Sequence, residues 1–408
     1  MEYSPKYLVM VTADNHNKYY KMTPHGDSWT AEWGRIGAGS QKKDYPRSQF
    51  EQKYREKVKK GYVDQTSLVQ DLIQVQVKQN VNNGYRNIEN QAIATIVNRL
   101  QMMAKQAIDA NYTIKSNAVT TAMVNAAQQI INQLLRIKDL RSDLRLFNET
   151  LLTLFNTIPR RMTRVSDYLA NSTADFPKII KREQDLLDVM KGQVIQHVAV
   201  DTPVQDVNSG SQTILEKLGL EFEECSPADI VVIKKALGDC RARLVNAWKV
   251  TNNKTQARFD AFCKDAGIRK KMLLFHGSRN ENWWSIIQTG LVLRPTNAII
   301  TGKMFGYGLY YATKAQKSLG YTSLQGSYWA GGNSSSGFMA LMDVAVGQSF
   351  DVYSHKHEYT TYNWDKLQRA KPGAKSLFAH AGKMLYNDEI IVYKEEQSTI
   401  KYLLELTK

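Results

Sequence analysis

The sequence predicts a multidomain α+β fold, in which a small β-rich domain, an all-α bundle and a mixed or antiparallel β domain follow one another. Two observations support this prediction. The chain has 408 residues, which is enough for several separate hydrophobic cores. Its pattern also changes twice, from short strand-like runs to long helical periodicities and back to strands. We therefore expect domains over residues 1–67, 68–193 and 194–408.

The first region carries short apolar and aromatic runs separated by Asn-, Asp- and Gly-containing turns, a pattern typical of β-hairpins. A basic amphipathic segment follows, in which Phe50, Tyr54 and Val58 are spaced four apart and Gly61 is a helix stop. The expected elements are strands over 7–11, 19–22 and 29–33 and a helix over 47–62.

The second region has almost no strand signal. Its apolar residues recur at i, i+3, i+4 and i+7, which predicts amphipathic helices that bury their Met and Leu stripes in a shared core. Pro159 ends one periodic stretch and Gly192 ends the last one. The apolar faces lie within 93–104, 130–137, 151–158 and 186–190.

In the third region strand patterns return, separated by Gly- and Ser-rich loops. One helix-like stretch runs from Trp283 to Gly290, directly after an apolar strand. The expected strands cover 194–200, 244–250, 273–276, 339–346, 390–393 and 402–406.

Composition limits the class of protein. A content of 43% hydrophobic and 23% charged residues is that of an ordinary globular chain. We find no apolar run long enough to span a bilayer and no secretory signal at the start, so we expect no membrane segment and no secretion. The three cysteines (Cys225, Cys240 and Cys263) fit neither a disulfide framework nor a zinc site, which favours buried thiols in a reducing compartment.

The formal net charge of +15 favours a polyanionic partner, although a solvated basic surface is the alternative. The location of the charge helps to decide. Lysines and arginines are concentrated between residues 42 and 60, close to the Trp33-Gly34-Arg35 sequence. This density is what contacts with nucleic-acid phosphates require.

The third region contains several site-like motifs. The segment LLFHGSRNENWWSIIQTGL (273–291) places His-Gly-Ser at the mouth of a strand. Each motif alone has an ordinary structural explanation, such as a hydrogen-bonded histidine or a solvated strand entrance. Together they form an ordered set: His-Gly-Ser at 276–278, GYGLYYA at 306–312, KSLGY at 317–321 and YNDEIIVY at 386–393.

This ordered set resembles the catalytic domain of the poly(ADP-ribose) polymerase family, the ADP-ribosyltransferases with a His-Tyr-Glu triad. The likeness covers roughly residues 194–408. In the front half, WTAEWGRIG resembles a WGR domain, and LFNTIPRR with REQDLLDVM resembles the helical regulatory domain of that family. A WGR, helical and catalytic domain in this order resembles the short, DNA-dependent members.

The resemblance implies that NAD is bound as a substrate, without a metal. His276 would bind the adenosine ribose, the Gly277 backbone and the Ser318 hydroxyl would bind the nicotinamide amide, and Tyr310 and Tyr321 would stack on its ring. Glu389 would be the catalytic acid, completing a triad with His276 and Tyr310. The further implied residues are Ser278, Arg294 and Lys317 at the cofactor site, Met304 on the acceptor side, and Trp33, Arg35, Lys42, Lys43 and Asn17 at the DNA surface.

Two positions depart from the family pattern. Both Asn387 and Asp388 separate the tyrosine from the glutamate, where the family has one residue. Because neighbouring strand residues point to opposite faces, only one of Asp388 and Glu389 can face the pocket, and the spacing to the following Ile-Val-Tyr selects Glu389. Val292 stands where the family often has an arginine, which implies either a weaker affinity for NAD or reliance on Arg294.

The expected function is DNA-stimulated transfer of ADP-ribose from NAD to proteins, including the chain itself, with release of nicotinamide and extension into polymer at DNA damage. Two alternatives stay open: a mono-ADP-ribosyltransferase with a protein or nucleic-acid acceptor, and a catalytically inactive scaffold that binds DNA ends. We expect a nuclear location in a eukaryote, or the cytoplasm and nucleoid in a prokaryotic or viral setting. The oligomeric state is not predicted.

Overall fold

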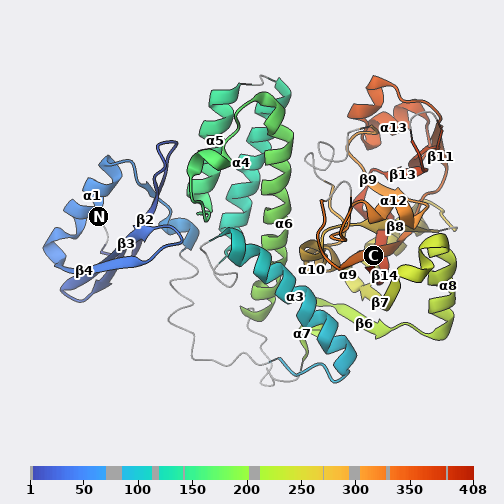
Figure 1. Ribbon diagram of the computed structural model, residues 1–408, viewed down its shortest axis with the longest axis horizontal. Coiled ribbons are helices and arrows are strands. Elements are labelled where there is room, and N and C mark those ends of the chain that lie inside the picture. The colour runs from blue at the N-terminus through green and yellow to red at the C-terminus, as the bar shows by residue number, and fades with distance from the viewer. Residues whose placement is uncertain are drawn as a thin grey trace. The chain divides into compact units, whose positions relative to one another are not determined.

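The computed structural model describes residues 3–69, 85–112, 119–140, 143–201, 212–269, 271–293, 304–327, 331–382 and 385–408, with backbone alone at 195–201 (Figure 1). The chain forms two compact units. One consists of Met1–Asn82 with Lys105–His197, and the other of Asn83–Ala104 with Val198–Lys408. The predicted α+β class is confirmed, because a small sheet, a set of long helices and a larger sheet all occur.

In the first unit, a five-stranded antiparallel sheet has the order β4-β3-β2-β1-β5 and packs against α1. The core between them contains Leu8, Tyr20, Trp29 and Phe50, all buried. The helix expected over 47–62 is confirmed, but Val58 on its expected apolar face is 42% exposed. The elements are β1 (Lys6–Val11), β2 (Asn17–His25), β3 (Ser28–Arg35), β4 (Ser40–Pro46), α1 (Phe50–Lys59) and β5 (Val63–Asp64).

The helices of the first unit bury the apolar stripes that the sequence predicted. Their core also encloses an ion pair, because Arg160 and Glu183 are both 2% exposed and contact one another. A second Arg160 nitrogen donates to Asn111 Oδ1 at 3.0 Å. Burying two charges is tolerated only when they are paired and hydrogen-bonded in this way. The helices are α3 (Gln91–Asn111), which is shared between the units, α4 (Thr121–Leu140), α5 (Leu144–Thr157) and α6 (Phe176–Asp201).

The small sheet is joined to these helices by side chains that bond backbone groups. Asn156 on α5 pairs with both backbone groups of Val11, accepting at 2.8 Å and donating at 3.0 Å. Arg35 at the end of β3 donates to the carbonyl oxygens of Met162 and Thr163, at 3.2 and 2.7 Å. The β-rich and helical parts are therefore one unit.

The strand expected over 194–200 is wrong, because α6 continues through Gly192 to Asp201. A glycine inside a helix costs about 1 kcal/mol relative to alanine, which is too little to end a long helix. The three valines between 194 and 200 favour strands, but Leu187, Met190 and Val194 continue a buried helical face.

The second unit contains a nine-stranded sheet with the order β11-β12-β13-β9-β8-β10-β14-β7-β6. All neighbouring strands are antiparallel except β11 and β12, so the sheet is mixed. The strands are β6 (Leu220–Glu224), β7 (Leu244–Asn252), β8 (Met272–Gly277), β9 (Leu309–Ala312), β10 (Ser336–Val344), β11 (Ser349–Val352), β12 (Ser376–Ala379), β13 (Glu389–Val392) and β14 (Ser398–Thr407).

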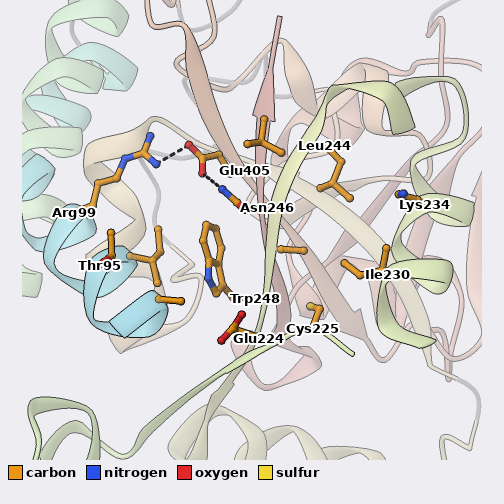
Figure 2. A pocket seen from close by; sticks show the side chains of 14 residues that line it. Thr95, Arg99, Glu224, Cys225, Ile230, Lys234, Leu244, Asn246, Trp248 and Glu405 are labelled. Atoms are coloured by element: carbon orange, nitrogen blue, oxygen red, sulfur yellow. Dashed lines mark hydrogen bonds and ion pairs between the residues drawn. The ribbon is translucent and has the colours of Figure 1, made fainter. Parts of the chain in front are cut away.

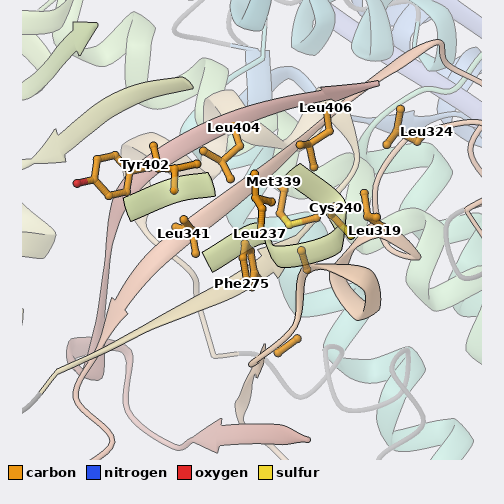
Figure 3. Packing of buried hydrophobic residues seen from close by; sticks show 13 residues of the cluster. Leu237, Cys240, Phe275, Leu319, Leu324, Met339, Leu341, Tyr402, Leu404 and Leu406 are labelled. Atoms are coloured by element: carbon orange, nitrogen blue, oxygen red, sulfur yellow. The ribbon is translucent and has the colours of Figure 1, made fainter. Parts of the chain in front are cut away.

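Short helices flank this sheet. Figure 3 shows Leu237 and Cys240, from α8 and the turn after it, packed against Met339, Leu341 and other apolar side chains of the sheet. Leu319 of α12 belongs to the same buried cluster, so this core anchors the short helix that carries the KSLGY motif. The helices are α7 (Ile214–Leu218), α8 (Pro227–Leu237), α9 (Asn253–Asp265), α10 (Trp283–Thr289), α12 (Ala315–Leu319) and α13 (Trp364–Ala370).

Two composition-based expectations can be compared with the structure. Within the described ranges, no helix has the length and apolar character needed to cross a membrane. Cys240 and Cys263 are buried, whereas Cys225 is half-buried, and all three are free thiols. Burial, with the nearby Asp229 charge second, raises the pKa of Cys225 to about 12, which keeps this thiol protonated.

Candidate active site

Two segments that would form the walls of the predicted nicotinamide pocket lie in contact with one another. The first is the end of β8, where Gly277 pairs with Met339 of β10. The second runs from α12 to Tyr321. The walls touch at Gly277, where an added Cβ would overlap the Ser318 carbonyl oxygen and lie 3.3 Å from the Tyr321 Cβ. The contact itself requires glycine, which explains why the motif has no side chain there.

His276 lies beside this wall with a defined proton arrangement. Its Nδ1 is 3.1 Å from the Tyr310 carbonyl oxygen, which can only accept, so Nδ1 carries the proton. Burial lowers the pKa of His276 despite this hydrogen bond, so the ring is neutral at pH 7. Its Nε2 is then an acceptor that can take a hydrogen bond from a sugar hydroxyl.

Tyr310 and Tyr321 keep their phenols protonated. Burial raises the pKa of both groups, to about 12 for Tyr321, and the negative charge of Glu389 raises them further. The Tyr310 hydroxyl donates to the Gly306 carbonyl oxygen at 2.9 Å and accepts from the Phe305 N–H at 3.3 Å. Its ring is therefore held in a fixed orientation.

Glu389 begins β13, where it pairs with Ala312 on one side and Ala379 on the other. Its Oε1 lies 2.7 Å from Lys317 Nζ, and the two side chains are 12% and 15% exposed. Asp388 points elsewhere, because its Oδ1 accepts from the Ala381 N–H at 2.7 Å. The extra residue before the glutamate thus leaves one of the two carboxylates beside Lys317.

The remaining predicted residues are placed as follows. Ser278 accepts a hydrogen bond from Asn282 at 3.0 Å. Met304 is half-buried and, like Tyr310, packs against the apolar cluster around Phe305 and Leu377. Val292 is half-buried, and Arg294 lies outside the described residues.

The geometry combines a fixed carboxylate, a neutral imidazole and two protonated phenols around a glycine contact. A carboxylate beside a ribose can stabilise positive charge that develops at its anomeric carbon, as in glycoside hydrolysis. No group of His, Cys, Asp or Glu side chains suited to a metal ion occurs among the residues that the structure describes.

The predicted DNA residues fall into two groups. Lys42 and Lys43 are exposed on β4, and Trp33 is half-buried on Tyr20, with ring centroids 6.0 Å apart. Asn17 does not fit the prediction, because its side chain is 1% exposed and its Nδ2 donates to the Arg160 carbonyl oxygen at 3.0 Å. A buried amide with this bond joins the sheet to the helices and cannot meet DNA in this structure.

Asn280 lies two residues beyond the His-Gly-Ser motif, but no sequence pattern indicates a role for it. It is 8% exposed, and its side chain contacts β10 while its backbone N–H donates to Ser323. These partners lie 43 to 58 residues away in the chain, so no local pattern reveals them.

A separate cavity of about 520 Å³ lies in the second unit, between α3, α8 and β7. Figure 2 shows Trp248 in this cavity and the contacts of Glu405 with Arg99 and Asn246 at its edge. None of the residues predicted to bind NAD lines it, so it is distinct from the candidate active site.

Two protein families match parts of this chain. The poly(ADP-ribose) polymerase catalytic domain matches residues 232–408, and the WGR domain matches residues 5–69. A poly(ADP-ribose) polymerase-like protein, 100L, of Invertebrate iridescent virus 6 is 31% identical over 164 residues, which is 40% of this chain and 84% of that protein.

Poly(ADP-ribose) polymerase 2 of Homo sapiens is 29% identical over 170 residues, or 36% of this chain and 28% of the human protein. Poly(ADP-ribose) polymerase 2 of Arabidopsis thaliana is 30% identical over 36% of this chain and 25% of its own length. The chain thus spans about a quarter of these two relatives. On the combined matches, it belongs to the poly(ADP-ribose) polymerase family, with a WGR domain ahead of an NAD⁺ ADP-ribosyltransferase catalytic domain.

Proposed function

We propose that this chain transfers ADP-ribose from NAD⁺ to protein side chains, including its own, in response to DNA breaks, and extends the product into chains. The observation that carries the proposal is the position of Glu389. It is nearly buried, 2.7 Å from Lys317, and its charge raises the pKa values of Tyr310 and Tyr321. These four side chains therefore lie together.

Each group then has a role in the transfer. The bond between nicotinamide and the ribose C1′ breaks, and nicotinamide leaves with the bonding electrons. The Glu389 carboxylate, next to the ribose hydroxyls, stabilises the positive charge on the sugar, while Tyr310 and Tyr321 orient the departing ring. An acceptor oxygen forms the new bond to C1′, and Glu389 can take its proton, assistance worth about 10²–10⁴-fold. The inactive-scaffold alternative is disfavoured because the extra residue leaves Glu389 beside Lys317.

Stimulation by DNA rests on the first unit. Lys42 and Lys43 offer positive charge on an exposed strand, and Arg35 on the next strand bonds the backbone after α5. DNA bound at this sheet would compete for or reorient Arg35, which gives the helices a way to respond to binding. The proposed site of action is chromosomal DNA, in whichever compartment holds it.

The proposal is tested by incubating the chain with labelled NAD⁺, with and without nicked DNA, followed by gel separation of the products. We expect heavy, heterogeneous labelling that increases when DNA is added. Equal labelling in both tubes would eliminate the DNA switch. Discrete single-unit bands would instead support the mono-ADP-ribosyltransferase alternative, and nuclease-sensitive label would identify a nucleic-acid acceptor.

A further inference from the structure

We propose that Asn280 is a positioning residue of the nicotinamide pocket and that Arg99, on α3, supports it through Ser336. The inference rests on the proposed function, because it concerns how the pocket walls are held for NAD⁺. It assigns roles to three residues outside the motifs that define the site.

Asn280 joins the two pocket walls. It follows the His276–Ser278 wall by two residues, and its backbone N–H donates to Ser323 Oγ at 2.9 Å. Ser323 in turn lies two residues beyond Tyr321, at the end of the other wall. The hydrogen bond therefore ties together the outgoing ends of both segments.

The Asn280 side chain fixes the same point to the sheet. Its Nδ2 donates to the Ser336 carbonyl oxygen at 3.1 Å, and its Oδ1 accepts from the Phe338 N–H at 3.2 Å. Phe338 is fully buried and directly precedes Met339, where the pairing of β10 with β8 begins at Gly277. An asparagine is suited to this position because it offers a donor and an acceptor together to one strand.

Arg99 contacts the same strand, β10, through the side chains of Ser336 and Phe338. One guanidinium nitrogen donates to Ser336 Oγ at 2.8 Å and another lies 2.6 Å from Glu405 Oε1. The guanidinium also lies over the Phe338 ring at 5.1 Å. Glu405 is 6% exposed and accepts from Asn246 with its second oxygen at 2.9 Å, as Figure 2 shows, so Arg99 has a rigid anchor.

These contacts form a continuous path from α3 through Ser336 and Asn280 to the nicotinamide pocket. Because these two walls would hold the nicotinamide ring, a residue that fixes both of them should affect NAD⁺ binding without touching it. Its removal is expected to raise KM and to change kcat little, since Glu389 and Lys317 are not its partners.

The test compares two buried asparagines in the full-length chain. Asn280→Ala is expected to raise the KM for NAD⁺ about tenfold with kcat within about twofold. The matched control is Asn252→Ala. Asn252 is 1% exposed and makes four bonds to backbone groups, but its partners are residues 254, 255, 287 and 288, none of them in the walls. The control should lower the melting temperature and leave KM unchanged.

A second pair tests the outer end of the path. Arg99→Ala is expected to raise KM about threefold, whereas Arg86→Ala should not change it. Arg86 is a suitable control because it also pairs with carboxylates of the second unit, Glu89 and Glu216, at 3.0 and 3.1 Å. If Asn280→Ala does not fold, Asn280→Asp retains an acceptor for the Phe338 N–H and should give an intermediate KM.

Calorimetric titration with nicotinamide separates this inference from the proposed function. If the wild-type chain does not turn over NAD⁺, the proposed function fails, and weaker nicotinamide binding by Asn280→Ala would still support the positioning role. If both asparagine variants lower the melting temperature and neither changes KM or nicotinamide affinity, Asn280 is merely structural and the inference is overturned.

Discussion

Replacing Gly277 with alanine would place a methyl group against the opposite wall of the pocket. The new Cβ would lie 3.0 Å from the Ser318 carbonyl carbon and closer still to its oxygen, within a distance that real Cβ atoms essentially never adopt. The obstacle is backbone, which cannot rotate away, so the walls must separate by about 1 Å. We expect a loss of about 1–3 kcal/mol in stability and about a 100-fold loss in kcat/KM.

Steady-state NAD⁺ consumption and thermal unfolding measure both effects. Gly39→Ala is the control, because a Cβ at Gly39 meets nothing within 4 Å and its backbone has an ordinary φ. The control should match the wild type in KM and in melting temperature. A Gly277→Ala chain with wild-type kcat/KM would show that the two walls do not define the NAD⁺ site.

Three further results are expected. His276 is half-buried and neutral in the folded chain, so below its ordinary pKa of 6.5 the unfolded state binds more protons and stability falls as the pH drops. Denaturant titrations should show a weaker fall for His276→Gln. Lys43→Ala should reduce the slope of log DNA affinity against log salt by about one, whereas Lys264→Ala on α9 leaves it unchanged. Glu183→Ala leaves the buried Arg160 without its carboxylate partner and should lower the free energy of unfolding, measured with urea, by about 3–5 kcal/mol. The exposed Glu149→Ala should lower it by at most about 0.5 kcal/mol.

Much of the fold follows from local patterns. The strands β7, β8, β10, β13 and β14 of the large sheet appear as short apolar runs bounded by turns, and the helices appear as 3.6-residue stripes. The strand expected over 194–200 was wrong because two signals conflict there. The valines after Gly192 favour a strand, whereas the buried apolar stripe continues the helix. Continuation of an existing helix prevails there, since each added residue gains a hydrogen bond without a new nucleus.

Only part of the candidate site could likewise be predicted from local sequence. His276, Gly277, Lys317, Ser318 and Glu389 lie in short motifs, and the structure brings these motifs together around one glycine contact. Residues whose contacts lie far away in the sequence could not be predicted from short motifs. The bonds of Asn280 span 43 to 58 residues, and the buried side chain of Asn17 bonds the Arg160 carbonyl oxygen, 143 residues away.

One carboxylate, Glu389 at the start of β13, should be required for the transfer, and its neighbour Asp388 should not. The direct measurement is incorporation of labelled ADP-ribose by two neighbouring variants, Glu389→Gln and Asp388→Asn, both isosteric and both on the full chain. We expect Glu389→Gln to lose at least about 100-fold in kcat, whereas Asp388→Asn should stay near wild type because the Asp388 carboxylate bonds the Ala381 N–H instead. Loss of activity in Asp388→Asn with full labelling by Glu389→Gln would contradict this expectation.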